Sequence, residues 1–145
     1  MTSLKEILSN KLSKKDLQIL PKSFDVVGDI AIFNKFPKEL YKKSKVIGES
    51  LISINKSIKV VAIKSKNYTG RLRTLKLKII AGEKKKETIY KENGIILKLN
   101  VEKCYFSPRL SSERLRIAKL VRPNEDVLVL FSGVGPYQCV IAKNS

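Results

Sequence analysis

The sequence has 145 residues, with 30 lysines and arginines against 13 aspartates and glutamates, so its formal net charge is +17. This length suits one ordinary domain or two small ones, and 43% hydrophobic residues are enough for a packed core. The absence of histidine excludes zinc fingers, zinc hydrolases and histidine-based catalysis, and we expect no metal site. No apolar stretch is long enough for a membrane span and no signal peptide precedes the first helix, so we expect a cytoplasmic protein without a membrane partner.

The positive charge is the most informative global property. Such an excess attracts polyanions, most often nucleic acid. The alternative is a solvated basic surface, which occurs in lysine-rich proteins of AT-biased or heat-adapted organisms. The two cysteines, Cys104 and Cys139, lie far apart in the chain, and we expect no disulfide between them in the cytosol.

The first third of the chain predicts two short helices and two strands. Apolar residues recur every three to five positions over residues 4–20, and residues 13–16 have the form of a helix capping box. Pro21 ends this helical segment. Residues 24–33 are two apolar runs joined at a Gly-Asp turn, residues 28–29, which predicts paired strands.

The middle of the chain predicts a mixed sheet with one long helix. Residues 40–54 place their apolar side chains on one helical face and lysines on the other, which is typical of a surface helix. The β-branched run 58–63 and the alternating run 72–80 predict strands. Residues 81–83 then turn the chain.

The last third predicts a hairpin followed by an incomplete βαβ unit. Residues 88–90 pair plausibly with residues 95–101 across Asn93-Gly94, a favoured hairpin turn. A polar connection leads to a final strand, residues 127–131, a glycine turn and the opening of a helix. This arrangement is the first half of a βαβ unit, which needs a parallel partner strand to bury its faces.

Basic residues gather between Leu51 and Gly82, where the sequence has eight lysines and arginines and no acid. Within this region we expect residues 64–71 to form an exposed loop with Tyr68 among cations, suited to phosphate contacts and base stacking. Tyr68 as a buried loop anchor is the alternative. The candidate nucleic-acid-binding residues are Lys64, Lys66, Tyr68, Arg71, Arg73, Lys76 and Lys78.

Residues 105–114 are denser in polar groups than a connection requires. Arg109 and Arg114 offer two planar guanidinium groups suited to carboxylates, phosphates or base edges. In the alternative interpretation, Ser111 or Ser112 caps the helix that runs through residues 117–121 and the charged side chains face water.

The segment 131–136, Phe-Ser-Gly-Val-Gly-Pro, follows the expected final strand and opens a helix. At this position in a mononucleotide-binding fold, glycines let the backbone approach a cofactor. The segment lacks the third glycine of a dinucleotide fingerprint and the Gly-Lys-Ser/Thr of a P-loop. A tight structural turn is therefore the alternative to a cofactor loop.

Five motifs together resemble one known family. In chain order they are Phe-Asp-Val-Val-Gly-Asp-Ile-Ala at 24–31, Ala-Gly-Glu at 81–83, Tyr-Lys-Glu-Asn-Gly at 90–94, Tyr-Phe-Ser-Pro-Arg-Leu-Ser-Ser-Glu-Arg at 105–114, and the glycine segment at 131–136. They resemble the archaeal and eukaryotic tRNA (guanine-N1) methyltransferases that act at position 37. The sister enzymes that transfer an aminocarboxypropyl group in wybutosine synthesis share them, whereas the Ser-Pro-Arg-Leu form favours the methyltransferases.

The resemblance implies an α/β fold with two parts. Residues 1–103 would form a small mixed α/β domain with possible tRNA contacts. Residues 104–145 would supply the first strand, glycine loop and helix start of a Rossmann-like class I methyltransferase domain, dependent on S-adenosylmethionine and incomplete here.

The same resemblance implies roles for individual residues. Arg109 matches the arginine directed at the target guanine, where a guanidinium stabilises charge on O6 as N1 loses its proton. Arg114 would suit the methionine carboxylate. The sequence departs from the family at Val129, where an acidic residue is usual. The candidate cofactor-binding residues are Ser107, Arg114, Phe131, Ser132, Gly133, Gly135 and Pro136.

Three functions follow as hypotheses. The first is the N-terminal portion of a tRNA guanine-N1 methyltransferase, inactive as an isolated polypeptide and bound to tRNA in a salt-dependent way. The second is a tRNA-binding module or accessory subunit, completed by a separate chain that carries the rest of the methyltransferase domain. The third is an aminocarboxypropyltransferase of the wybutosine pathway.

Overall fold

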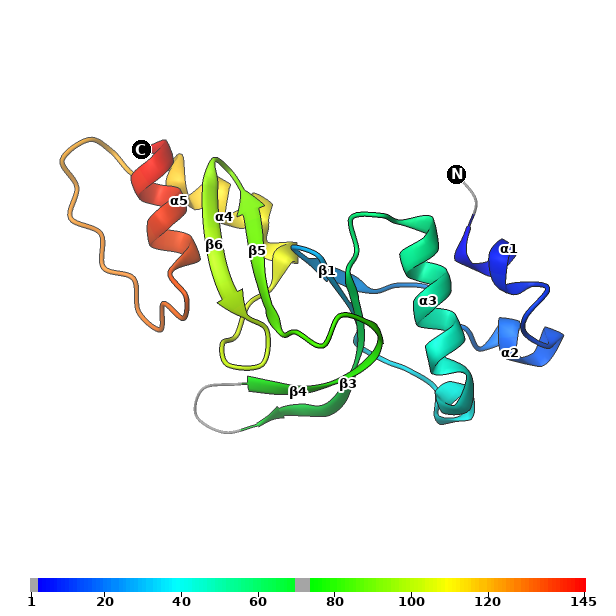
Figure 1. Cartoon of the computed structure of the whole chain (residues 1–145). Helices are drawn as coiled ribbons and strands as arrows, with labels where there is room; N and C mark the ends of the chain where they lie inside the picture. Colours follow the sequence, from blue (N-terminus) through cyan, green and yellow to red (C-terminus); the bar gives the residue numbers. More distant parts are fainter. Residues whose placement is uncertain (1–2, 70–73) are drawn as a thin grey trace.

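The computed structural model describes residues 3–69 and 74–145, apart from the side chains of residues 66–69 and 74. No helix in this described part is long and apolar enough to cross a membrane. Figure 1 shows helices α1 to α3 at one end of the molecule and α4 and α5 at the other, with the strands between them. The elements are α1 (Leu4–Leu8), α2 (Lys14–Gln18), β1 (Asp25–Val27), β2 (Ile30–Phe33), the 3₁₀ helix η1 (Lys38–Lys43), α3 (Ser44–Ile54), β3 (Val60–Thr69), β4 (Thr74–Gly82), β5 (Glu87–Glu92), β6 (Ile95–Asn100), the 3₁₀ helix η2 (Pro108–Leu110), α4 (Ser111–Ala118) and α5 (Pro136–Asn144).

The main sheet is mixed, as predicted, with the strand order β1-β2-β3-β4. Strand β2 pairs antiparallel with β1 and parallel with β3, and β3 pairs antiparallel with β4. The parallel pair is connected through α3, because a parallel connection must cross from one end of the sheet to the other. The predicted hairpin β5–β6 forms a separate two-stranded sheet, turned by Asn93 and Gly94 at φ 43° and 78°.

The two faces of the main sheet bury two different cores, because alternate residues of a strand point to opposite faces. Phe33 and Val61 face the core beneath α1 and α3, whereas Ile32 and Val60 face the core covered by β6. The sheet is therefore covered on both sides. The second core contains Val27, Ile30, Ile32, Val60, Ala62, Leu75, Leu77, Leu97, Leu99 and Val101.

The two predicted N-terminal helices are confirmed, and each begins with a capping box. In α2 the Ser13 hydroxyl accepts from the Asp16 backbone N–H, and the Asp16 carboxylate accepts from the Ser13 N–H. The same carboxylate forms an ion pair with Lys43 at the end of η1. The capping carboxylate of the five-residue helix α2 therefore also connects this helix to η1.

The expected loop at residues 64–71 is wrong for residues 64–69, because β3 continues through them. Lys64 pairs with Leu77 and Lys66 with Lys76, and register shifts interrupt the ladder nearby. An antiparallel partner of similar length satisfies the backbone of these polar residues, so polarity alone did not end the strand. Arg71 and Arg73 lie outside the described residues.

The expected strand at residues 127–131 is also wrong, since these residues have no strand partner in the described part of the chain. Leu128 and Leu130 are 84% and 69% exposed. A parallel strand requires a neighbour that supplies its hydrogen bonds. The predicted helix that follows is α5, and it begins at Pro136.

Capping of α4 by Ser111 or Ser112 is wrong as well. Helix η2 runs directly into α4, so the residue that precedes the first helical turn is Leu110, which makes no side-chain cap. Glu113 does face water, paired with Arg116 three residues later.

Candidate functional site

A cavity of about 680 Å³ lies where the segment before α4 meets the segment before α5. Its volume is in the range of sites that hold a small molecule or cofactor. Phe106 and Tyr137 give it aromatic walls, and Gly133 and Pro136 bring the backbone of the glycine turn to its edge. The lining residues are Lys103, Cys104, Tyr105, Phe106, Ser107, Leu110, Arg114, Phe131, Ser132, Gly133, Pro136 and Tyr137.

Six of the seven residues predicted to contact a cofactor line this one cavity: Ser107, Arg114, Phe131, Ser132, Gly133 and Pro136. The seventh, Gly135, is the N-cap of α5 and takes the left-handed φ of 79°. Gly133 is also left-handed, at φ 58°, so the two glycines allow the sharp turn before the helix. Phe131 has a positive φ of 54° and a fully exposed side chain at the rim.

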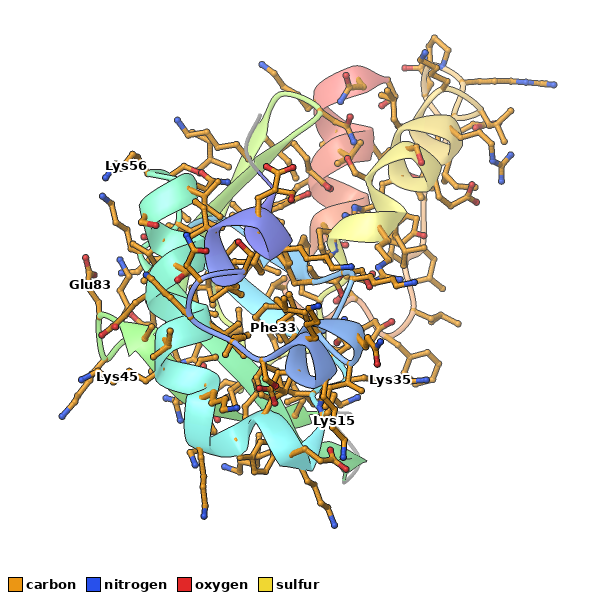
Figure 2. All side chains as sticks on the ribbon, turned by 90° about the vertical axis from the view of Figure 1, so that its right-hand side faces the viewer. Lys15, Phe33, Lys35, Lys45, Lys56 and Glu83 are labelled. Carbon is orange, nitrogen blue, oxygen red and sulfur yellow. The ribbon has the colours of Figure 1, made fainter. Side chains whose placement is uncertain are left out.

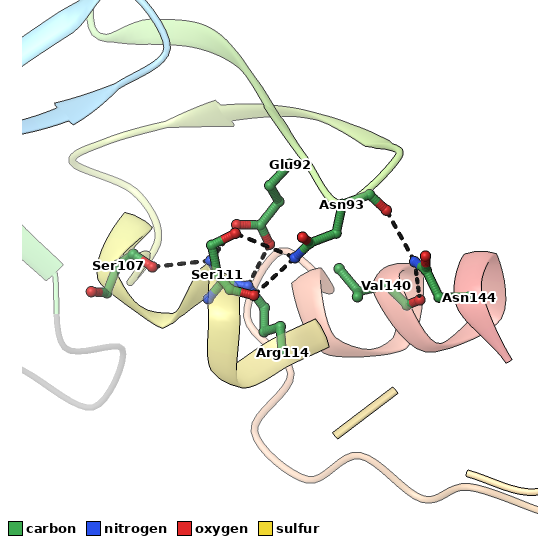
Figure 3. Close-up of polar contacts among 7 residues, drawn as sticks. All are labelled: Glu92, Asn93, Ser107, Ser111, Arg114, Val140 and Asn144. Atoms are coloured by element: carbon green, nitrogen blue, oxygen red, sulfur yellow. Dashed lines mark hydrogen bonds and ion pairs between the residues drawn. The ribbon is translucent and has the colours of Figure 1, made fainter. Parts of the chain in front are cut away.

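Arg114 is buried and engaged by a carboxylate of the protein itself. Its Nε pairs with one oxygen of Glu92, and its Nη2 donates to the other at 2.6 Å. Nη2 also donates to the Ser107 carbonyl at 3.1 Å, so Arg114 fixes the start of η2 (Figure 3). Glu92 thus occupies the two-pronged edge of the guanidinium that a ligand carboxylate would use.

Side-chain amides tie both C-terminal helices to the β5–β6 turn. The Asn93 amide donates to the Ser111 carbonyl at 2.8 Å, at the start of α4. The Asn144 amide, near the end of α5, donates to the Asn93 carbonyl at 3.0 Å and to the Val140 carbonyl at 2.9 Å (Figure 3). One turn therefore holds the two helices that flank the cavity.

Aromatic rings surround the buried ion pair. The Phe106 and Tyr90 rings meet edge to face with centroids 4.8 Å apart, and the Arg114 guanidinium carbon lies 5.1 Å from the Phe106 centroid. Burial, together with the negative charge of Glu92, raises the pKa of Tyr90 above 10. Burial also raises the pKa of the Cys104 thiol, which lowers its reactivity at neutral pH.

Arg109 lies next to the cavity lining but does not belong to it. Its neighbours Ser107 and Leu110 line the cavity, whereas the Arg109 Nε donates to Oδ1 of Asp25 on β1 at 2.7 Å. The Arg109 side chain is 65% exposed. The arginine therefore stands at the rim, held by the N-terminal sheet.

The predicted nucleic-acid-binding residues are only partly described. Lys76 and Lys78 are exposed on β4, and Lys64 on β3 is half-buried. The Lys78 ammonium lies 5.8 Å from the Tyr41 ring centroid. The side chains of Lys66 and Tyr68, together with the whole of Arg71 and Arg73, lie outside the described residues.

The helical side of the molecule is basic too, and most of its lysines lie outside the basic region at residues 51–82. Lys15, Lys35, Lys45 and Lys56 point outward there, while Phe33 lies inside (Figure 2). The sequence did not identify Glu92 and Asp25 as the partners of Arg114 and Arg109. Both residues lie inside the motifs at 90–94 and 24–31, which is the signal that could have pointed to them.

Comparisons with known proteins agree with the geometry. Residues 4–85 match the family described as the TYW2 N-terminal domain, and residues 88–145 match the TRM5/TYW2 methyltransferase domain. The chain is 45% identical over 128 residues to the tRNA (guanine(37)-N(1))-methyltransferase Trm5b of Pyrococcus abyssi, covering 88% of this chain and 38% of that protein.

Solved structures show the same relationship. The structure of aTrm5 in complex with tRNALeu has a TM-score of 0.84 at 38% identity, covering 98% of this chain and 43% of that one. TYW2 of Pyrococcus horikoshii in complex with MeSAdo has a TM-score of 0.74 at 30% identity, covering 97% and 49%. This chain spans about two fifths of the length of the curated relatives. Its α/β fold, its five motifs and both family matches show that the chain belongs to the TRM5/TYW2 family.

Proposed function

We propose that this chain takes part in methylation of N1 of guanine 37 in tRNA, with S-adenosylmethionine as the methyl donor. The observation that carries the proposal is that six of the seven predicted cofactor residues line the same cavity. The relatives named tRNA (guanine(37)-N(1))-methyltransferase support the substrate, and the structure of a homologue bound to tRNALeu supports tRNA as the partner.

The cavity fits an adenosine-containing molecule. Phe106 and Tyr137 supply flat apolar walls, and the backbone of residues 131–136 approaches from the opposite segment. The N-terminus of α5 adds a positive end to the lining, which suits a negatively charged group. When bound, S-adenosylmethionine supplies an activated methyl group; Arg114 and Ser107 shape the wall against which it lies.

Arg109 acts on the target base in this proposal. From the rim of the cavity, its guanidinium donates to guanine O6 and stabilises the negative charge that develops there as N1 loses its proton. Lys64, Lys66, Tyr68, Arg71, Arg73, Lys76 and Lys78 contribute tRNA contacts away from the base.

Cofactor binding is tested by calorimetric titration with S-adenosylhomocysteine. Ser132→Trp places an indole ring at the cavity wall and is expected to abolish binding, whereas Ser112→Trp, on an exposed position of α4 outside the lining, is expected to leave binding unchanged. Equal binding by both variants would overturn the assignment of this cavity to the cofactor.

The second candidate is an accessory subunit or tRNA-binding module whose catalytic domain is completed by a separate chain. The chain covers about two fifths of the relatives' length, which fits this candidate and the first one equally well. Intact-mass analysis of the native protein decides between the two. A mass well above 16.4 kDa shows one longer polypeptide, and a mass near 16.4 kDa with a co-purifying chain shows a partner.

The third candidate is aminocarboxypropyl transfer, which the match to the TYW2 N-terminal domain favours. The two reactions leave different products from the same cofactor. Methyl transfer leaves S-adenosylhomocysteine, while aminocarboxypropyl transfer leaves methylthioadenosine, so chromatography of the spent reaction separates them.

A further inference from the structure

The cavity-rim arginine is held by a residue far away in the sequence. Arg109 of η2 donates from Nε to Oδ1 of Asp25 at the start of β1, at 2.7 Å. The bond connects the part of the chain matched to the TYW2 N-terminal domain with the part matched to the methyltransferase domain. Through this bond the position of β1 affects where the Arg109 guanidinium lies at the rim of the cavity.

Asp25 is itself fixed in place. The Asn34 side-chain amide, which follows β2, donates to Oδ2 of Asp25 at 2.5 Å. Asp25 also pairs with Ile32 across the β1–β2 ladder. Because one carboxylate oxygen is used by Asn34 and the other by Arg109, the carboxylate cannot rotate without losing a hydrogen bond.

The bond to Asp25 uses only one of the three nitrogens of the guanidinium. An arginine has five N–H donors, and four of them belong to Nη1 and Nη2. Within the described residues neither terminal nitrogen of Arg109 takes part in a hydrogen bond, and the side chain is 65% exposed beside the cavity lining. The terminal pair of nitrogens is therefore accessible to a planar acceptor.

We propose that Asp25 is a positioning residue, which holds Nε of Arg109 so that both terminal nitrogens face the O6 and N7 edge of the target guanine. Two parallel donors fit this edge of guanine, and a lysine in the same place lacks them. The inference rests on the proposed function and adds the residue that orients its arginine.

The test is equilibrium binding of two anticodon stem–loop RNAs by fluorescence anisotropy. One carries guanine at position 37 and the other carries 2-aminopurine, which lacks O6. The protein is the native one, together with any further chain that intact-mass analysis identifies. We expect the wild type to prefer guanine by about tenfold, and Asp25→Asn to reduce this preference to within about twofold.

Three variants make the result specific. Asp16→Asn removes a carboxylate of another ion pair and changes the net charge equally, yet keeps the tenfold preference. Arg109→Lys keeps a cation near Asp25 and loses the preference. In an Arg109→Ala background, Asp25→Asn has no further effect on the preference, because the residue through which it acts is gone.

A spectroscopic readout separates positioning from loss of the fold. In ¹H–¹⁵N spectra without RNA, the Arg109 Nε–H signal shifts in Asp25→Asn while the signals of the other arginines stay in place. A tenfold preference that survives in Asp25→Asn overturns this inference alone. A wild type that binds neither RNA, or binds both equally, overturns the proposed role of Arg109 as well.

Discussion

At the scale of single residues, the buried pair of Glu92 and Arg114 is the most consequential contact. Both side chains are almost fully buried, at 3% and 2% exposure. Removing one partner of such a pair leaves a charge buried without compensation, whereas an exposed pair contributes little. The pair also anchors the Ser107 carbonyl at the edge of the cavity.

Glu92→Gln is expected to lower the free energy of unfolding by about 3–5 kcal/mol, because Arg114 keeps its charge in the interior. Denaturant titration followed by circular dichroism measures the change. The control is Glu113→Gln, which breaks the exposed pair with Arg116 and costs less than about 1 kcal/mol. A loss for Glu92→Gln as small as that for Glu113→Gln would contradict the idea that the Arg114 charge is left buried without compensation.

At the scale of elements, the β1–β2 turn is joined to the segment around β5. The Asp29 carboxylate accepts from Thr88 at 2.8 Å and from Lys85 at 2.7 Å. Burial opposes ionisation of Asp29, yet these two hydrogen bonds outweigh it and hold the pKa of the carboxyl below 3.8. The joint therefore depends on an ionised Asp29.

The expected consequence is a loss of stability in acid. A carboxyl whose pKa is lowered in the folded state stabilises the fold fully above its unfolded pKa and progressively less as pH falls through the folded value. The melting-temperature difference between wild type and Asp29→Asn is therefore constant above about pH 5 and shrinks below 3.8. In Lys85→Met the Asp29 carboxyl loses one of the hydrogen bonds that lower its pKa. The melting temperature of this variant should therefore fall less in acid than that of the wild type, and an equal fall would contradict the role of Lys85.

The extended segment 127–131 behaves differently from the elements around it. Because Leu128 is 84% exposed, Leu128→Ser is expected to change the unfolding free energy by less than about 0.5 kcal/mol. The matched control on the neighbouring helix, Ile141→Ala, removes a side chain that is 7% exposed and costs about 2 kcal/mol or more. A large cost for Leu128→Ser would show that the segment is packed after all.

At the scale of the whole molecule, the +17 charge is spread over both the helical side and the β4 side. Exposed lysines that contact phosphates release counterions, so each contact adds about one to the slope of log K against log salt. We expect Lys76→Ala with Lys78→Ala to reduce the salt slope of tRNA binding by about two. The matched control is the double variant Lys45→Ala and Lys56→Ala, which removes one lysine from α3 and one from the loop after it. An equal reduction of the salt slope in this control would indicate unspecific attraction.

The sequence predicted those features that depend on local chemistry. The capping box at residues 13–16 and the Asn93-Gly94 turn were correct because neighbouring residues alone determine them. The strand at 127–131 was wrong because an apolar pattern reports a tendency, while a strand also needs a partner. The Glu92–Arg114 pair could not be predicted, since only packing brings residues 22 positions apart into contact.

Six of the seven residues that the motifs predict for cofactor binding line one cavity, because the two motifs that carry them lie at the start of α4 and just before α5. Their role in cofactor binding stays a prediction. The boundary at residue 103 stays a prediction, while the two family matches meet between residues 85 and 88.

The sharing of the second core by the main sheet and β6 has a consequence for synthesis on the ribosome. When residue 85 leaves the exit tunnel, the four-stranded sheet can form, but one of its faces lacks the leucines at 97 and 99. The nascent chain then presents a bare apolar sheet to solvent until some fifteen more residues emerge, at a synthesis rate of about 5–20 residues per second. Pausing of translation in this interval would prolong the exposure, so chaperone capture should be strongest for nascent chains arrested there.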